Sequence, residues 1–377
     1  MSLPECAGLT ALDTQRLQEA LTLAEQAIGL SDPNPRVGCV IGHADGRVLG
    51  RGHTQQAGGP HAEVMALRDA AAAGADTHGA TAWVTLEPCA HHGRTPPCTD
   101  ALRAAGIARV VASVGDPHPS VAGRGFAQLR AAGMAVVVAD GAIAAAARDL
   151  NIGFFSRVQR GRPWLRLKAA ASLDGRTALP DGRSQWITGP AARADGHAWR
   201  RRAGAVLTGI GTVLADDPRL DVRLVSTARQ PLRAVLDSAL RLPSIARLLQ
   251  TPGLVIYNCA DASGLAARQL REQGAEPVTV PGVGGRPDIA AVLADLGTRG
   301  VNELHVEAGA VLNGALLEAR WVDELLLYLA PTLLGPGAPI AHLASLASLD
   351  AAQRWQLVEL AHCGDDLRLR ARSGQKP

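Results

Sequence analysis

Short runs of apolar residues alternate with longer Ala-rich segments in the first part of the chain. The apolar runs predict strands at Val37–Ile41, Ala82–Leu86, Arg109–Ser113 and Ala135–Val138. The Ala-rich segments predict helices at Thr14–Ile28, Ala62–Ala73, Thr99–Ala104 and Gly125–Ala131. This alternation favours an α/β sheet that is mainly parallel, with one antiparallel hairpin that turns at Asp45 and Gly46.

A second alternating pattern follows residue 163. Its apolar runs predict strands at Trp164–Ala170, Ala205–Leu207, Arg233–Leu236, Leu254–Tyr257, Pro277–Val280, Glu303–Val306 and Glu324–Leu329, and a C-terminal hairpin of Trp355–Ala361 with Leu367–Ala371. Helices are expected at Pro190–Arg202, Ser263–Gln273, Asp288–Leu296 and Ala310–Glu318. A chain of 377 residues is long enough for two domains. We therefore predict one domain over 1–150, a linker over 151–163 and a second domain over 164–377.

Composition narrows the class of protein. Hydrophobic residues make up 47% and charged residues 19%, which excludes a largely disordered chain. A net charge of +3 and an aromatic content of 3% give little reason to expect a nucleic-acid surface. We see no apolar run long enough to span a membrane and no secretory signal, so we expect no membrane association and a cytoplasmic location. Six cysteines are too few for a disulfide scaffold and are better interpreted as metal ligands or nucleophiles.

Three short segments of the first domain contain the residue types of a catalytic zinc site. His61 opens a predicted helix, Glu63 follows two residues later, and Cys89 and Cys98 come after a predicted strand. One imidazole and two thiolates leave the fourth tetrahedral position of Zn²⁺ open for water, and Glu63 is close enough to move a proton. The alternative is a closed structural site, with His91 or His92 as the fourth ligand.

These segments resemble the cytidine and deoxycytidylate deaminase superfamily, whose pattern is H-x-E followed by P-C-x-x-C. The spacing departs from that pattern, because eight residues separate Cys89 from Cys98. With the insert PCAHHGRTPPC and the segment DPNPRVGCV, the domain is similar to the bifunctional deaminase–reductases of riboflavin biosynthesis. The resemblance implies His61, Cys89 and Cys98 as zinc ligands, Glu63 as proton shuttle, and Asn34 as a contact to the pyrimidine or sugar.

The second domain resembles the reductase half of the same family, with a fold like that of dihydrofolate reductase. Four stretches carry this likeness: Leu167–Thr177, Ser184–Gly189, Gly211–Arg223 and Val306–Gly314. The resemblance implies NADPH contacts at Ala170, Trp186, Thr212, Asp216, Ser238, Gly309, Ala310, Val311, Leu312, Asn313 and Gly314. It implies substrate contacts at Ser184, Arg200, Leu220, Arg223 and Glu307, and Lys168 lies at the start of the motif.

The residue chemistry agrees in part with this resemblance. Arg200 and Arg223 can grip the phosphate of a phosphorylated sugar, and Glu307 and Asp216 can hold or protonate sugar hydroxyls. Lys168 could polarise the ring-opened sugar.

We therefore expect a three-layer α/β/α deaminase domain joined to an NADPH-dependent reductase domain, acting on phosphorylated pyrimidines. From the family we also expect a homo-oligomer, a dimer or a tetramer. Two alternatives stay open at this stage. One is a nucleoside or tRNA deaminase with an appended domain, for which residues 1–150 offer few aromatic side chains. The other is a non-enzymatic interaction protein with a structural zinc ion.

Overall fold

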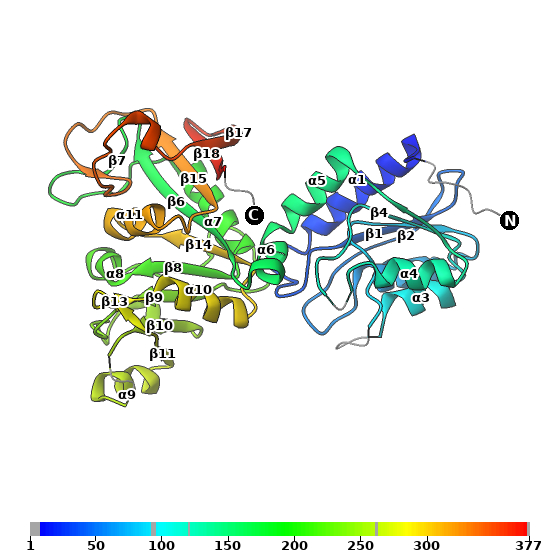
Figure 1. Cartoon of the computed structure of the whole chain (residues 1–377), viewed down its shortest axis with the longest axis horizontal. Coiled ribbons are helices and arrows are strands. Elements are labelled where there is room, and N and C mark those ends of the chain that lie inside the picture. Colours follow the sequence, from blue (N-terminus) through cyan, green and yellow to red (C-terminus); the bar gives the residue numbers. More distant parts are fainter. Residues whose placement is uncertain (1–7, 92–95, 120, 261–262, 375–377) are drawn as a thin grey trace. The chain divides into compact units, whose positions relative to one another are not determined.

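The structure is a computed structural model that describes residues 8–91, 96–119, 121–260 and 263–374. The chain forms two compact units, Met1–Arg160 and Gly161–Pro377, and each is described by itself (Figure 1). Within the described ranges, no helix combines the length and the apolar character that a membrane span requires.

Unit 1 is built on a mixed sheet. Its strands are β1 (Gly38–Gly42), β2 (Val48–His53), β3 (Thr81–Val84), β4 (Arg109–Ala112) and β5 (Ala135–Val138), in the order β2-β1-β3-β4-β5. Its helices are α1 (Ala11–Glu25), α2 (Ala62–Ala72), α3 (Cys98–Ala104), α4 (Arg124–Ala131), α5 (Gly141–Leu150) and α6 (Ile152–Arg160). β1 runs antiparallel to β2 and β3, whereas β3, β4 and β5 are parallel.

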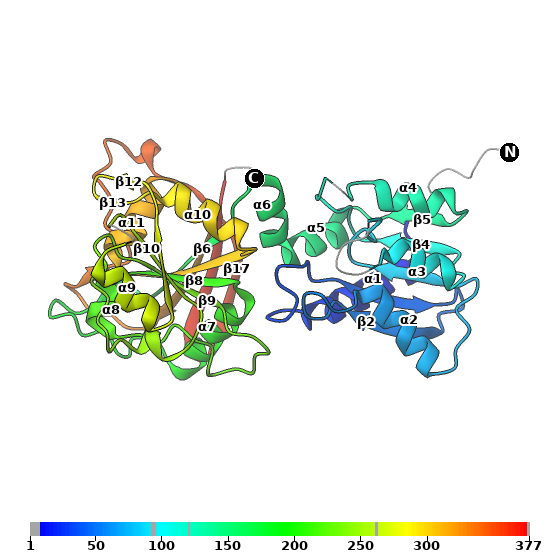
Figure 2. The same ribbon diagram turned by 90° about the horizontal axis from the view of Figure 1, so that it is seen from below.

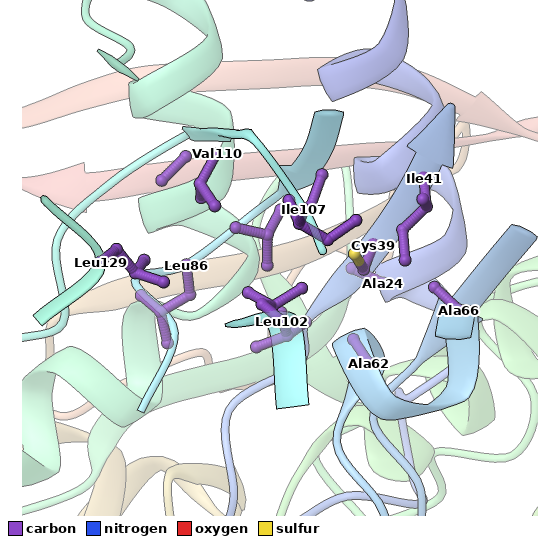
Figure 3. Packing of buried hydrophobic residues seen from close by; sticks show 14 of the residues in the cluster. Ala24, Cys39, Ile41, Ala62, Ala66, Leu86, Leu102, Ile107, Val110 and Leu129 are labelled. Atoms are coloured by element: carbon purple, nitrogen blue, oxygen red, sulfur yellow. The ribbon is translucent and has the colours of Figure 1, made fainter. Parts of the chain in front are cut away.

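Helices cover both faces of this sheet, which gives the three layers that the sequence predicted. Alternate residues of a strand point to opposite faces, so Ile41 packs with α2 and α3 on one face, while Val40 and Trp83 pack against α1 on the other. Figure 3 shows the first of these cores, where Ala62 and Ala66 of α2 lie near Cys39. Small alanines allow α2 to lie close to the strands, and a Cβ added at Gly50 would come within 2.1 Å of the Ala66 carbonyl oxygen.

The end of unit 1 differs from the expected linker. Residues 152–160 form helix α6, and Phe154 packs into the core of unit 1. The division between the units falls between Arg160 and Gly161, ten residues beyond the predicted end of the first domain. The observed division lies inside the predicted linker of 151–163. The sequence-based prediction missed the apolar face of 152–160, which α6 buries.

Unit 2 contains a long sheet whose order is β11-β10-β9-β8-β14-β6-β15-β18-β17. Its strands are β6 (Trp164–Ser172), β8 (Ala205–Gly209), β9 (Leu232–Leu236), β10 (Leu254–Asn258), β11 (Ala275–Thr279), β14 (Glu303–Glu307), β15 (Glu324–Ala330), β17 (Trp355–Cys363) and β18 (Asp366–Ser373). The strands from β11 to β15 in this order are parallel, and the β17–β18 hairpin adds antiparallel strands at one edge.

In the described part of unit 2 there are five α-helices. They are α7 (Pro190–Arg202), α8 (Ile210–Asp216), α9 (Leu265–Glu272), α10 (Ile289–Thr298) and α11 (Ala310–Glu318). Figure 2 shows α10 and α11 on one side of the sheet and α7 and α9 on the other, and the buried clusters agree with this arrangement. Short pieces complete the unit: β7 (Arg176–Ala178) with β16 (Ala338–Pro339), β12 (Gly282–Val283) with β13 (Arg286–Pro287), and the 3₁₀ turns η1 (Arg247–Gln250) and η2 (Leu349–Ala351).

One face of the unit 2 sheet carries a buried layer of charged residues beneath α7. Glu303, His305 and Glu307 alternate along β14 and point to the α7 side, while Leu304 and Val306 join the opposite core. Arg166 of β6 is fully buried in this layer and binds Glu303 and Glu324 at 2.8 and 2.6 Å. Buried charges persist only when they are paired, and this network supplies the partners.

Candidate active sites

The candidate zinc ligands converge at one edge of the unit 1 sheet because of the strand directions. Gly38, at the start of β1, pairs with His53 at the end of β2, and Cys39 pairs with Val84 at the end of β3. Segments that precede β1 and segments that follow β2 and β3 therefore emerge together. Asn34 precedes β1, His61 follows β2, and Cys89 follows β3.

His61, Cys89 and Cys98 form the one cluster of metal-ligating side chains found among the described residues, with their ligand atoms all within 4.8 Å of one another. The His61 Nδ1 atom lies 3.6 Å from the Cys89 Sγ atom and 3.3 Å from the Cys98 Sγ atom. Tetrahedral zinc with ordinary bond lengths would separate such atoms by about 3.6 Å. The three side chains therefore fit one zinc ion. His91 is not part of this cluster but stacks on His118, and His92 lies outside the described residues.

Two helix starts place the ligands. His61 is the N-cap residue of α2 but makes no side-chain capping bond, so its imidazole is turned to the cluster. Cys98 is the first residue of α3, and its backbone N–H donates to the Cys89 sulfur at 3.3 Å. Hydrogen bonding to Cys98 and to His61 lowers the pKa of the Cys89 thiol to about 4, which favours the thiolate that binds metal.

Glu63 lies in the first turn of α2 and is 3% exposed. Burial, and after it the negative charge of Cys89, raises the pKa of its carboxyl group to about 7, although His61 opposes this shift. A carboxyl group with a pKa near neutrality can both accept and release a proton at physiological pH. Glu63 thus has the property that a proton shuttle needs.

Glu87 is a buried residue of this site that the sequence reading did not single out. Its carboxylate accepts backbone N–H groups of Asp116, Gly123 and Phe126 at 3.2, 3.0 and 3.2 Å. Glu87 therefore ties the loop after β4 and the start of α4 to the segment that continues into Pro88 and Cys89. The available signal was its position directly before the Pro-Cys pair.

The candidate reductase residues gather at the carboxyl ends of adjacent parallel strands in unit 2. β9, β8, β14 and β6 are neighbours. Ser238, Thr212 and Gly309 follow the ends of the first three strands, and Ala170 lies near the end of β6. Such an edge is where open α/β sheets bind ligands. A Cβ atom added to Gly309 would lie 3.8 Å from the Thr212 hydroxyl, so these two candidate cofactor contacts are adjacent.

Gly309 is the N-cap of α11 and provides no capping side chain, which leaves the helix N–H groups to a ligand such as a pyrophosphate. Two of the predicted cofactor contacts, which lie inside α11, face inward instead. Asn313 donates to the carbonyl oxygens of Ala308 and Ile340, and Gly314 packs against the carbonyl of His342. These two residues hold the turn in place.

Glu307 is the centre of the candidate substrate site. Arg200 from α7 binds both of its carboxylate oxygens and also donates to the Asp221 carbonyl at 2.9 Å. The Lys168 Nζ atom lies 3.9 Å from the carboxylate. Burial alone would raise the pKa of Glu307, but Arg200 and Lys168 outweigh it and hold the pKa well below its usual range. Burial lowers the pKa of Lys168.

Other candidates lie in the loops around this edge. Arg223 binds Asp221 at 2.5 Å with a half-exposed side chain, and Leu220 is buried with a φ of 54°. Asp216 ends α8, where burial raises its pKa. Trp186 is 66% exposed and lies beside the Arg193 guanidinium, at 4.6 Å. Ser184 is half-buried in the same loop.

The fold and the sites define a zinc-dependent deaminase domain followed by a reductase domain. Residues 11–114 match the model of the cytidine and deoxycytidylate deaminase zinc-binding region, and residues 163–369 match that of the RibD C-terminal domain. The chain belongs to the RibD family of riboflavin-biosynthesis proteins, whose members combine a zinc-binding deaminase domain with an NADPH-dependent reductase domain. The sequence-based expectations of fold class, two activities, zinc and NADPH are thereby confirmed.

Similar proteins cover the whole length of both units. The riboflavin biosynthesis protein RibD of Escherichia coli is 45% identical over 95% of this chain and 98% of that protein. A crystal form of Acinetobacter baumannii RibD is 40% identical, with a TM-score of 0.86 over 97% of this chain and 99% of the other. A Thermotoga maritima structure described as a diaminohydroxyphosphoribosylaminopyrimidine deaminase/5-amino-6-(5-phosphoribosylamino)uracil reductase is 30% identical, with a TM-score of 0.86 over 96% of this chain and 99% of that one.

Proposed function

We propose that the chain catalyses two successive steps on one phosphorylated pyrimidine. Unit 1 removes an amino group from 2,5-diamino-6-ribosylamino-4(3H)-pyrimidinone 5′-phosphate, and unit 2 reduces the resulting 5-amino-6-(5-phosphoribosylamino)uracil to the ribityl compound. The observation that carries this proposal is the convergence of His61, Cys89 and Cys98 beside a buried Glu63 at one sheet edge.

In the deaminase step, His61, Cys89 and Cys98 hold zinc, which when bound supplies Lewis-acid activation of water. The Glu63 carboxylate takes a proton from the attacking water and delivers it to the amino nitrogen, which leaves as ammonia. The elevated pKa of Glu63 suits both transfers. Asn34 emerges at the same edge and orients the pyrimidine or its sugar.

In the reductase step, NADPH supplies the hydride when it is bound. The turn after β14, together with Ala170, Trp186, Thr212, Asp216 and Ser238, forms the cofactor site. Ser184, Leu220 and Arg223 line the substrate site beside Arg200. Arg200 and Lys168 keep Glu307 ionised, so Glu307 accepts hydrogen bonds from sugar hydroxyls rather than donating a proton. Lys168 has a lowered pKa and is the residue that can donate a proton to the sugar oxygen as the ring opens.

We also propose that the protein is cytoplasmic and forms a homo-oligomer, either a dimer or a tetramer. β17 is an edge strand of the long sheet, and Leu357, Val358 and Leu360 are exposed along it. Exposed apolar edge strands favour pairing with another chain.

A coupled assay on the full-length protein tests the two-step function. Deaminase substrate, zinc and NADPH are supplied together, and ammonia release and NADPH consumption are followed. Wild type should release ammonia and then consume NADPH. Glu63→Gln keeps the size of the side chain but cannot shuttle a proton, so it should lower ammonia release about 10²–10⁴-fold with zinc still bound.

Each variant contains its own control, because the unit that is not substituted should keep its activity. Given the deaminated intermediate, Glu63→Gln should consume NADPH at the wild-type rate, whereas Glu307→Gln should lose this activity and keep ammonia release. Wild-type protein that binds zinc but releases no ammonia would contradict the proposal and favour a structural metal.

A further inference from the structure

The segment that leads out of unit 1 is tied to the turn that carries Asn34. Asn151 is buried at the start of this segment. Its side-chain oxygen accepts the backbone N–H of Arg36 at 2.7 Å, and its side-chain nitrogen donates to the carbonyl oxygen of Arg36 at 2.9 Å. One amide thereby pairs with both backbone groups of a single residue, as a neighbouring strand would, and fixes the plane of that backbone.

Two further bonds connect the same segments. The Arg36 guanidinium is buried and donates to the Leu150 carbonyl oxygen at 3.0 Å. Arg157, in the second turn of α6, donates to the Pro33 carbonyl oxygen at 3.1 Å. Pro33 and Arg36 flank Asn34 on either side, so the end of α5 and helix α6 hold both ends of the turn.

The strand ends hold the turn from the other direction. The Val37 N–H donates to the Thr54 hydroxyl at 3.2 Å, and the Gly38 N–H donates to the Thr85 hydroxyl at 3.1 Å. Thr54 follows β2 toward His61, and Thr85 follows β3 toward Cys89. Within the turn, Ser31 bonds to Asn34 itself: the Asn34 N–H donates to the Ser31 carbonyl oxygen at 2.9 Å, and the Ser31 hydroxyl donates to the Asn34 carbonyl oxygen at 3.2 Å. The position of this turn relative to the metal cluster therefore depends on the threonines at the strand ends and on the segment that contains the buried Asn151.

We propose that Asn151 is a positioning residue for the deaminase reaction, which acts through Arg36 to hold Asn34 against the substrate. This inference rests on the proposed contact between Asn34 and the substrate. A misplacement of about 1 Å can cost on the order of 10²-fold in kcat/KM. Because the anchor sets the place of a binding group and touches neither the ligands nor Glu63, its loss raises KM more than it lowers kcat.

The test compares full-length variants. Asn151→Ala removes both hydrogen bonds to Arg36, and Asn34→Ala removes the group that is positioned. Gln159→Ala is the control, because it alters an exposed side chain of α6, the helix that follows Asn151. Deaminase kcat and KM, zinc content, and reductase kcat/KM on the deaminated intermediate are measured for each. Asn151→Ala should raise the deaminase KM about 10–100-fold and change kcat less than about threefold. Its zinc content and reductase activity should match those of wild type and Gln159→Ala.

The double variant Asn34→Ala with Asn151→Ala separates positioning from general stability. If Asn151 acts through Asn34, the double variant should have the KM of Asn34→Ala alone. A fold-change in KM equal to the product of the two single fold-changes would mean that the two residues act independently, and it would overturn the inference. An unchanged KM in Asn151→Ala, with a raised KM in Asn34→Ala, would overturn it while leaving the proposed role of Asn34 intact. An unchanged KM in Asn34→Ala would remove that role and the inference with it.

Arg157→Gln keeps the inference testable if Asn151→Ala does not fold. It shortens the side chain that reaches Pro33 and leaves the Asn151 bonds in place. It should raise the deaminase KM about 3–10-fold. Combined with Asn34→Ala, it should leave the KM at the value of Asn34→Ala alone. A wild-type KM in a folded, zinc-bound Arg157→Gln would contradict the proposal.

Discussion

Glu63 and Glu307 are both buried carboxylates, and their surroundings shift their pKa values in opposite directions. Beside Glu63 the next largest influence after burial is a thiolate, and the pKa rises to about 7. Beside Glu307 stand Arg200 and Lys168, and the pKa falls well below its usual range. The same side chain therefore suits proton transfer in unit 1 and a fixed negative charge in unit 2.

His197 predicts a pH dependence of the stability of unit 2. It is buried, and its Nδ1 atom accepts the backbone N–H of Arg223 at 3.1 Å. Burial, with the charges of Arg200 and Arg223, lowers its pKa to about 4. Between that value and about 6.5 the unfolded chain binds more protons at this site than the folded one, so stability falls as the pH drops through this window.

Urea unfolding at pH values above and below this window measures the effect. His197→Ala should be less stable than wild type at neutral pH, because the N–H of Arg223 loses its partner, but it should lose less stability on acidification. An equal difference between variant and wild type at both pH values would contradict the assignment.

At the scale of elements, close packing of helices on strand ends fixes the sites. α4 begins against the Pro88 carbonyl, with no room for a side chain at Gly125, and Glu87 binds the N–H groups of this start. α6 holds the Asn34 turn, and α7 brings Arg200 to Glu307 at the end of β14. In unit 1, α4 and α6 contain no zinc ligand, yet their contacts determine where the Cys89 segment and the Asn34 turn lie.

Gly125→Ala tests the packing of α4. Its Cβ atom would meet the Pro88 oxygen at 2.1 Å, so α4 must move away from the segment that leads to Cys89. We expect a loss of about 1–3 kcal/mol in the free energy of unfolding and weaker zinc retention under chelation. Urea unfolding and metal analysis measure both.

Gly196→Ala in α7 is the matched control. Nothing lies within 4 Å of the added Cβ atom, and alanine is the better helix former, so it should stabilise by about 0.5–1 kcal/mol. Equal effects from the two substitutions would show that the contact with Pro88 does not matter.

At the scale of the whole molecule, two units with separate cores carry the two reactions, and each unit assembles its site at one edge of its own sheet. Fusion in one chain gives equal numbers of the two units. The exposed apolar residues of β17 lie on an edge strand of the long sheet, where a second copy could cover them.

Leu360→Asp tests the proposed oligomer. A charge on the edge strand should weaken pairing between copies and lower the mass measured by light scattering after size-exclusion chromatography, while zinc content stays unchanged. A wild-type mass would place the interface elsewhere. A wild-type protein that is monomeric at assay concentration would remove the oligomer proposal.

The sequence alone determined the fold class, the order of most strands and helices, and the chemistry of both halves. Period-two and helical patterns are local properties, and His61, Glu63, Cys89 and Cys98 stand in segments whose residue types are distinctive.

Tertiary structure decided what depends on contacts between distant residues. Residues 152–160 are not a linker but a helix, because Phe154 enters the core and Asn151 binds Arg36. The alternation of Glu303, His305 and Glu307 predicts a strand but not a buried charged layer. That layer exists because Arg166 lies within it and the arginines of α7 lie opposite it. No local pattern records which side chains will meet across a fold.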